Sequence, residues 1–350
     1  MATSNIRLST ADHISLLSNL STLLASGVPI LEAVASLSED TKGNLKKILE
    51  ALMEDLKQGK QVSDSFAAFP ESFDKVTVNL IKAAEGAGTL DETLKDLRDY
   101  TQKEAEFIDK IIFALIYPGI ILVLFASVLL VILIVVIPKI ATVFLRLKVP
   151  LPLPTRIMIF MSTALLENTV WVVGGLLLIT VAVILLYRKN RHLVLEVVFM
   201  LPVVSSLVRD IDLTRFSRSL YLLLRSGVPI TTALELASQV VVRRQTSQLF
   251  AKAKEMVYSG KRFSEGIRQN KGIVPNIMIK LIEAGEKSGT LETSMADVAN
   301  YLDYQVTNRL KAVTAIIEPA LLIAVGLSVG GMMLAIIAPI YGLVGQIGGR

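Results

Sequence analysis

Residues 23–30 read Leu-Leu-Ala-Ser-Gly-Val-Pro-Ile, and residues 223–230 repeat them as Leu-Leu-Arg-Ser-Gly-Val-Pro-Ile. Further matches follow in the same order and at the same offset of 200 or 201 residues: Ala83–Leu90 with Ala284–Leu291, Pro118 with Pro319, and Pro138 with Pro339. This offset is too long for a short-period solenoid. The sequence therefore predicts a tandem duplication, in which each copy has a polar helical domain that leads into an apolar span.

The composition favours a membrane protein, because 52% of the residues are hydrophobic and only 19% are charged. Cysteine is absent, which excludes a disulfide framework, a thiolate nucleophile and a zinc–cysteine site. The only histidines, His13 and His192, lie in unrelated contexts. Residues 1–12 are polar, so we expect no cleavable signal peptide.

Three stretches are apolar and long enough to cross a bilayer, which needs about 20 residues. They are residues 111–137, 169–187 and 314–340, the last with its apolar run from about Ala320 to Ala338. A fourth apolar run, residues 157–166, is too short to span alone, and we interpret it as an interfacial or re-entrant helix.

The order of these stretches predicts the topology. Equivalent units that insert in the same direction need an odd number of crossings between them, and residues 169–187 supply one. Both polar domains then lie on one side of the membrane, as in a parallel repeat. Nine Lys and Arg residues near the domain-side ends of the spans, against five on the other side, favour cytoplasmic domains. The expected segments are a helical domain (1–110), a transmembrane helix (111–137), a non-cytoplasmic linker (138–168), a second transmembrane helix (169–187), a second domain (188–313), a third transmembrane helix (314–340) and a short non-cytoplasmic tail (341–350).

Each polar domain is predicted to be a bundle of about six helices separated by glycine and proline. Gly27 and Gly227 suit left-handed helix caps, and Pro29 and Pro229 suit the first turn of the next helix. The helices that follow are expected at residues 30–40 and 43–58 in copy one, and at 230–242 and 244–259 in copy two. Capping boxes are expected at Ser9 with Asp12 and at Thr89 with Glu92.

A repeated glutamate corner is the sharpest local motif. Glu85 and Glu286 end apolar helices just before the turns at Gly88 and Gly289. A helix carboxyl end disfavours an isolated carboxylate, so a cation or a nearby helix amino end must compensate. Two interpretations remain open: a contact point for a partner or for the other copy, and an internal clamp between two helices.

Other acidic and small residues suggest further sites. Glu318, near the start of the third span, could face a bundle interior or reach the headgroups. Gly326, Gly330 and Gly331 favour close helix packing in lipid. Four acids at the start of a long helix form a solvated face or, as a weaker alternative, a divalent-cation site: Asp91, Glu92, Asp96 and Asp99.

Several function classes lack their motifs. There is no phosphate loop, no Gly-x-Ser-x-Gly and no metal-spaced histidine pair, so we expect neither an enzyme nor a bound cofactor. The net charge is −6 over residues 1–110 and +8 over residues 188–311, and the arginines are scattered along amphipathic helices, which argues against nucleic-acid binding. A transporter or channel built from parallel repeats remains the alternative, although the first two spans contain no ionisable residue other than tyrosine.

The motifs together resemble one family. Ser-Gly-Val-Pro-Ile, then Gly-Lys-x-x-Ser, then Glu-x-x-Gly-Thr-Leu, twice over, together with the linker Leu153–Arg156, resemble the PilC/GspF family of inner-membrane platform proteins. The resemblance covers residues 10 to 345 and implies the all-α fold described above, in the bacterial inner membrane. It also implies partners: a hexameric assembly ATPase, pilin or pseudopilin subunits, other inner-membrane assembly components and further copies of the chain.

Two features depart from the family pattern. Many relatives carry a further amino-terminal segment, which puts the contacts of that segment in doubt for this chain. The glutamate corner of copy one reads Ala84-Glu85-Gly86-Ala87-Gly88 rather than Gly-Glu-x-Ser-Gly.

The opposite charges of the copies suggest a head-to-tail contact between unlike domains, within or between protomers. A membrane scaffold for some other complex is a third possible class of function.

Overall fold

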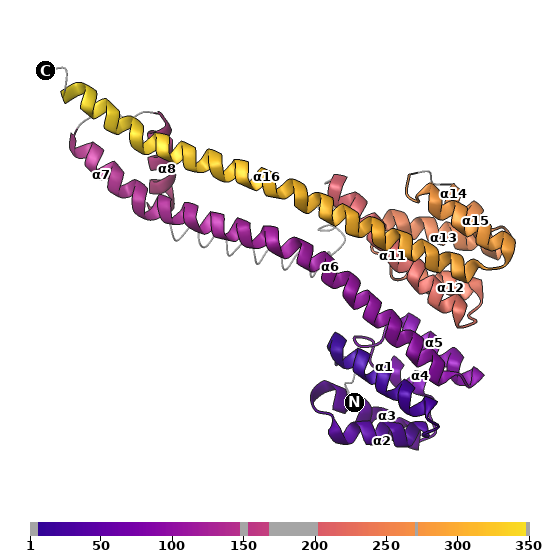
Figure 1. Cartoon of the computed structure of the whole chain (residues 1–350). Helices are drawn as coiled ribbons and strands as arrows, with labels where there is room; N and C mark the ends of the chain where they lie inside the picture. The colour runs from indigo at the N-terminus through magenta and orange to yellow at the C-terminus, as the bar shows by residue number, and fades with distance from the viewer. Residues whose placement is uncertain (1–5, 148–152, 168–201, 270–271, 348–350) are drawn as a thin grey trace. The chain divides into compact units, whose positions relative to one another are not determined.

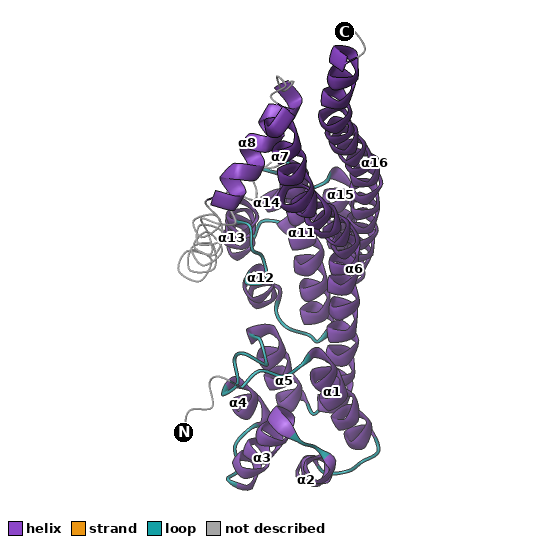
Figure 2. Ribbon diagram, turned by 90° about the vertical axis from the view of Figure 1, so that its left-hand side faces the viewer, coloured by secondary structure: helices purple, strands orange, loops and turns teal. Residues whose placement is uncertain are grey.

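The computed structural model describes residues 6–147, 153–167, 202–269 and 272–347. Every regular element within these ranges is a helix, and no β-strand occurs among them (Figure 2). The chain divides into two compact units. One unit contains residues 1–110 and 205–308, which are most of both polar domains, and the other contains residues 111–204 and 309–350.

Copy one contributes its polar helices to the first unit (Figure 1). Its core is built from leucines of the first helix and from phenylalanines, with Phe66 stacked on Phe73 at 4.3 Å between ring centroids. This is the stripe that the helical periodicity predicts. The helices are α1 (Thr10–Ala25), α2 (Ile30–Asp40), α3 (Gly43–Lys57), α4 (Val62–Ala67), α5 (Lys75–Ala87) and α6 (Leu90–Val131).

Copy two repeats this order. Phe216 stacks on Phe250 at 3.5 Å between centroids, and both side chains are fully buried. The helices are α11 (Pro202–Arg225), α12 (Ile230–Ser238), α13 (Arg244–Tyr258), α14 (Phe263–Arg268), α15 (Asn276–Ser288) and α16 (Leu291–Ile347).

The repeated corners have the predicted backbone. Gly27 and Gly227 have φ of +81° and +75°, which is the left-handed conformation that glycine adopts without steric cost. Pro29 and Pro229 differ by one position from the prediction. Their ψ angles of 142° and 137° are extended, so each proline is the N-cap and the next helix begins at the following isoleucine.

Helix α12 ends four residues before the predicted boundary of residue 242. The run Val240-Val241-Val242 is β-branched, and such residues favour extended backbone over helix. Asp212 of α11 also holds this segment, because its carboxylate accepts hydrogen bonds from the backbone N–H of Val242 at 3.0 Å and Arg243 at 2.8 Å. These contacts place a carboxylate beside the amino end of α13, where the helix dipole favours negative charge.

The second unit contains the apolar parts of α6 and α16. Two helical stretches are long and apolar enough to cross a membrane, Leu90–Thr142 and Leu291–Gly331. Large hydrophobic side chains lie exposed along both, including Phe113, Val123 and Leu327. The predicted span at residues 169–187 lies outside the described residues.

The first apolar helix continues beyond its predicted end. It passes through a π-helical turn, η1 (Ile132–Val136), into α7 (Ile137–Leu147), and α8 (Leu153–Glu167) packs against η1 and α7. The short helix predicted at residues 157–166 is therefore longer than expected. Pro138 does not end α7, because a proline near the start of a helix needs no N–H donor there.

Candidate functional site

Both glutamate corners close onto a neighbouring helix of their own copy. The Glu85 carboxylate accepts hydrogen bonds from the N–H of Val62 at 2.5 Å and of Ser63 at 3.0 Å. Glu286 accepts from the N–H of Phe263 at 2.6 Å and of Ser264 at 3.2 Å. These N–H groups belong to the first turns of α4 and α14, where a helix has unpaired donors and a positive dipole end. Each carboxylate therefore joins the end of one helix to the start of another.

The glycines of the corners have two separate roles. Gly88 and Gly289 both have φ of +73° and end α5 and α15 in the left-handed conformation. Gly285 has no positive φ but lies against α16: a Cβ built there would come within 2.7 Å of the Ser294 Cβ. Copy one has Ala84 at this position, so the sequence difference between the corners reflects a closer helix approach in copy two.

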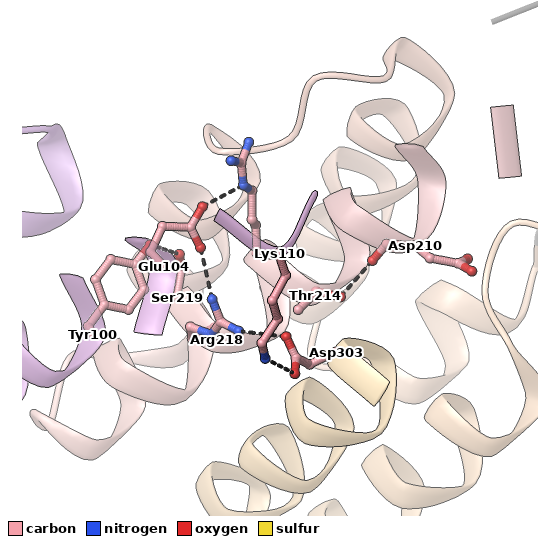
Figure 3. Close-up of polar contacts among 9 residues, drawn as sticks. Tyr100, Glu104, Lys110, Asp210, Thr214, Arg218, Ser219 and Asp303 are labelled. Atoms are coloured by element: carbon pink, nitrogen blue, oxygen red, sulfur yellow. Dashed lines mark hydrogen bonds and ion pairs between the residues drawn. The ribbon is translucent and has the colours of Figure 1, made fainter. Parts of the chain in front are cut away.

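The two copies meet at an acidic residue of α6. Glu104 accepts a hydrogen bond from Arg215 Nε at 2.7 Å through one oxygen, and from Arg218 Nη1 at 2.9 Å through the other (Figure 3). The Glu104 side chain is 19% exposed and that of Arg218 is 12% exposed. Because this pair is largely shielded from water, its Coulombic attraction is stronger than that of a surface salt bridge.

Arg218 extends the network to a third helix. Its other terminal nitrogen lies 3.6 Å from Asp303 Oδ1 on α16, while Lys110 of α6 lies 3.3 Å from Asp303 Oδ2 (Figure 3). The guanidinium also lies over the ring of Phe107, 5.2 Å from its centroid. One arginine of α11 thus links α6 and α16, the two helices that continue into the apolar stretches.

Two further contacts join α6 to α11. Arg225 Nε lies 3.1 Å from Asp96 Oδ2, and the hydroxyls of Tyr100 and Ser219 are 3.0 Å apart. Burial, with a smaller effect from Glu104, raises the pKa of Tyr100 far above its usual value, so its hydroxyl stays protonated. Burial also raises the pKa of Asp96, and the charge of Arg225 opposes this shift.

A charged cavity of about 460 Å³ lies beside these contacts, and Asp96, Tyr100 and Arg225 are among the residues that line it. Acidic and basic side chains both face it, including Asp99, Lys103 and Glu106, so the cavity has no single sign of charge. This mixture suits a hydrated interface between helices better than a site for one ion. The opposite net charges of the copies were the sequence signal for this contact, but no motif indicated which residues make it.

Other predicted site residues lie apart from this network. Glu318 is exposed on α16 in the second unit, and no described side chain lies near enough to Gly326, Gly330 or Gly331 to meet an added Cβ. Asp91 and Glu92 do not converge with Asp96 on a metal site, since no three acidic or histidine side chains among the described residues could hold one ion together.

The fold and its interface define a class: a helical membrane protein built from two tandem copies of one unit. The family model for "Type II secretion system (T2SS), protein F" matches the chain twice, at residues 16–138 and 216–339. The two matches coincide with the two copies, and together they cover more than half of the chain. The chain belongs to the type II secretion system protein F family.

Curated relatives match over nearly the whole chain. The "Type IV pilus assembly protein PilC" of Thermus thermophilus is 30% identical over 335 residues, which are 94% of this chain and 81% of the relative. The protein of the same name from Myxococcus xanthus is 28% identical over 93% of this chain and 79% of its own length. The "Type II secretion system protein F" of Aeromonas hydrophila is 28% identical, with 93% and 84% covered.

Proposed function

We propose that this chain is a non-enzymatic membrane platform for the assembly of pilin-like subunits, in a type IV pilus or a type II secretion system. Its membership of the protein F family supports this role, as do the names of its relatives. The observation that carries the proposal is the continuity of α6 and α16. Each begins in a charged helical domain and continues, without a break in the described helix, into an apolar stretch.

In this proposal a cytoplasmic assembly ATPase docks on the two polar domains. A movement of either domain would pass along α6 or α16 into the membrane, since a helix transmits displacement along its axis. The Glu104, Arg218 and Asp303 contacts would make the two helices move together. The apolar stretches would then receive a pilin or pseudopilin from the bilayer and lift it into the filament.

The proposed topology is that of a multi-pass protein of the bacterial inner membrane with both domains in the cytoplasm. Residues 111–137, 169–187 and 314–340 are the proposed spans, and further copies of the chain are proposed partners. Cysteine labelling of the cysteine-free chain tests this arrangement. Cysteines introduced at residue 39 and at residue 255 should react with a membrane-impermeant maleimide only after the membrane is opened. Labelling of either cysteine in intact cells would contradict this topology.

Co-purification tests the role itself. The full chain should retain an assembly ATPase and a pilin-like protein after mild cross-linking in its own cells, and its deletion should abolish filaments or secretion while leaving both partners expressed. If the deletion left both filaments and secretion intact, the proposal would be contradicted. Solute flux in proteoliposomes that contain this chain alone would instead favour a transporter or channel, for which Glu318 would be the first residue to replace.

A further inference from the structure

A second cavity, of about 360 Å³, is lined mainly by copy one, with Arg215 and Val240 of copy two also on its wall. Three polar side chains line it, one from each of three helices: His13 of α1, Thr77 of α5 and Thr101 of α6. None of the three takes part in the ion pairs that join the copies. The volume lies within the range of small-molecule sites, near its lower end.

Copy two has apolar side chains where copy one has this polar lining. The repeat offset of 200 or 201 residues pairs each of the three polar residues with an apolar residue that is almost fully buried, and it pairs a small alanine of the cavity wall with a larger valine. Close apolar packing stabilises a helical domain, so packing alone does not explain the polar cavity of copy one. The pairs are His13 with Leu213, Thr77 with Met278, Thr101 with Leu302 and Ala105 with Val306.

Polar groups of the cavity retain unused bonding capacity. The Nε2 atom of His13 is buried and has no hydrogen-bond partner among the described residues. Arg215 donates to Glu104 through Nε, and its terminal nitrogens form no hydrogen bond with the described residues. Asp74 accepts from the Thr77 N–H through Oδ1 at 2.8 Å, which leaves its second oxygen for another donor. Shielded polar groups without partners are costly, which favours a bound molecule that supplies those partners.

The charged groups at the cavity define what that molecule carries. Arg7 and Arg215 are the cations on the wall, and Glu71 and Asp74 are carboxylates that form no ion pair with the described residues. Both oxygens of Glu104, the remaining acid, already accept from arginines of α11. A ligand with one charge would meet a like charge in either pair, whereas a zwitterion can form charge-assisted hydrogen bonds with both.

We propose that this cavity binds a small zwitterion of the α-amino-acid class. The carboxylate of the ligand pairs with the two arginines, and its ammonium group pairs with Glu71 and Asp74. Because Arg215 belongs to copy two and the two carboxylates belong to copy one, the bound molecule stabilises the contact between the copies. Copy two does not bind it, since apolar side chains replace the polar lining there. The site does not depend on a role in filament assembly.

Thermal unfolding of the full chain in detergent tests this proposal, with each of the standard L-amino acids as the probe. At least one amino acid should raise the unfolding temperature in a saturable way, because a ligand that binds only the folded chain stabilises it. Acetate and methylammonium, which carry one charge each, are the controls and should not do so. The proposal is overturned if no amino acid gives a saturable rise, since the cavity would then hold water only.

Variants that introduce the copy-two residue locate the ligand. Ala105→Val and Thr101→Leu should each weaken binding of the stabilising amino acid by about tenfold or more in titration calorimetry, because they fill space that the ligand needs. The unfolding temperature without ligand should be unchanged or higher, which separates lost binding from lost folding, and either variant suffices if the other does not fold.

A charge variant gives an independent readout. Glu71→Gln should weaken binding by about tenfold, because it removes one of the two carboxylates that face the ammonium group. Glu50→Gln is the matched control, since Glu50 is exposed on α3 and does not line the cavity, and its affinity should equal that of the wild type. Wild-type affinity in Glu71→Gln and in the folded cavity-filling variants would place the ligand elsewhere and overturn the proposal.

Discussion

Arg218 of α11 donates a hydrogen bond to Glu104 of α6, with 2.9 Å between Nη1 and Oε2. The two residues are 114 positions apart in the chain and belong to different copies of the repeat. Their side chains are 12% and 19% exposed, so water screens the pair only in part. The same guanidinium approaches Asp303 of α16, so Arg218 takes part in ion pairs with both α6 and α16.

Replacing Arg218 by alanine should destabilise the first unit. The change leaves Asp303 without its arginine and Glu104 with only Arg215, and we expect a loss of about 2 kcal/mol, less than the cost of breaking a fully buried pair. Thermal unfolding of the full chain in detergent measures the effect. Arg268→Ala is the matched control, because Arg268 pairs with Glu283 on an exposed surface of copy two and should change the unfolding temperature little.

Glu85→Gln and Glu286→Gln should each cost about 1–2 kcal/mol, because the amide replaces one of two acceptor oxygens with a donor that faces a backbone N–H. Hydrogen exchange of the first turns of α4 and α14 should rise together with this loss. If Glu85→Gln instead left stability and exchange unchanged but abolished filament assembly, the result would contradict the interpretation of the corner as an internal clamp. It would support the interpretation of the corner as a contact point for a partner.

The glycine that differs between the corners gives a sharper test. Gly285→Ala should destabilise by about 1–3 kcal/mol, since its Cβ would overlap the Ser294 side chain. Gly86→Ala lies in the last turn of α5, the counterpart of α15 in copy one; no described atom lies within 4 Å of an added Cβ there, and Gly86 has an ordinary helical φ. It should be neutral or stabilise by about 0.5–1 kcal/mol, because alanine lowers the entropy of the unfolded chain. Equal effects at both positions would contradict the packing of α15 against α16.

Ser162 offers a test in the apolar unit. In η1 the Ile137 N–H bonds to Ile132 O, five residues back, and Pro138 has no N–H, so neither residue supplies a donor to the Leu133 carbonyl. The Ser162 hydroxyl of α8 donates to that carbonyl at 2.6 Å, in a buried position. An unpaired carbonyl is costly in an apolar environment.

Ser162→Ala should therefore lower the unfolding temperature in the wild-type background and have a smaller effect in a Pro138→Ala background, where an α-helical register can pair the Leu133 carbonyl. A double-mutant cycle with a coupling energy of about 1 kcal/mol is expected. Additive effects of the two changes would show that Pro138 does not cause the demand for Ser162.

His13 gives the chain a pH dependence. Its half-buried ring packs against Phe73, 4.9 Å between centroids, and the loss of hydration there lowers the pKa of His13 from 6.5, with the charge of Asp74 opposing the shift. The unfolded chain then takes up this proton more readily than the folded one, so stability falls as the pH drops through 6.5. The unfolding temperature should fall between about pH 7.5 and about pH 5.5, and His13→Phe should make that fall smaller. An identical fall in the variant would assign the pH dependence to other groups.

The repeat, the corners at Gly27 and Gly227, and most helix bounds were predictable from local chemistry. Glycine, proline and apolar spacing act within a few residues, and these are the signals that a single sequence carries. The end of α12 was misplaced because Asp212, 30 residues away, holds Val242 in extended backbone. No local pattern reports a contact at that distance.

For the contact between the copies, the sequence predicts only that the two domains attract each other electrostatically. A net charge of −6 in one copy and +8 in the other indicates attraction, but many arginines of copy two could have formed the ion pair with Glu104. The choice of Arg215 and Arg218 depends on which faces of α6 and α11 meet, and packing decides that. The π-helical turn was missed for a similar reason: Pro138 was visible in the sequence, whereas the hydroxyl that satisfies Leu133 comes from α8.

The central claim is that the two copies are held together by α6 and α11 and act as one body in filament or secretion assembly. The most direct measurement is an assembly assay in cells whose only copy of this gene carries Asp96→Arg, Arg225→Asp or both changes, at matched expression. The account predicts that each single change lowers assembly, since it sets like charges 3.1 Å apart in the wild-type geometry, and that the double exchange restores it. Wild-type assembly in both single variants would contradict it.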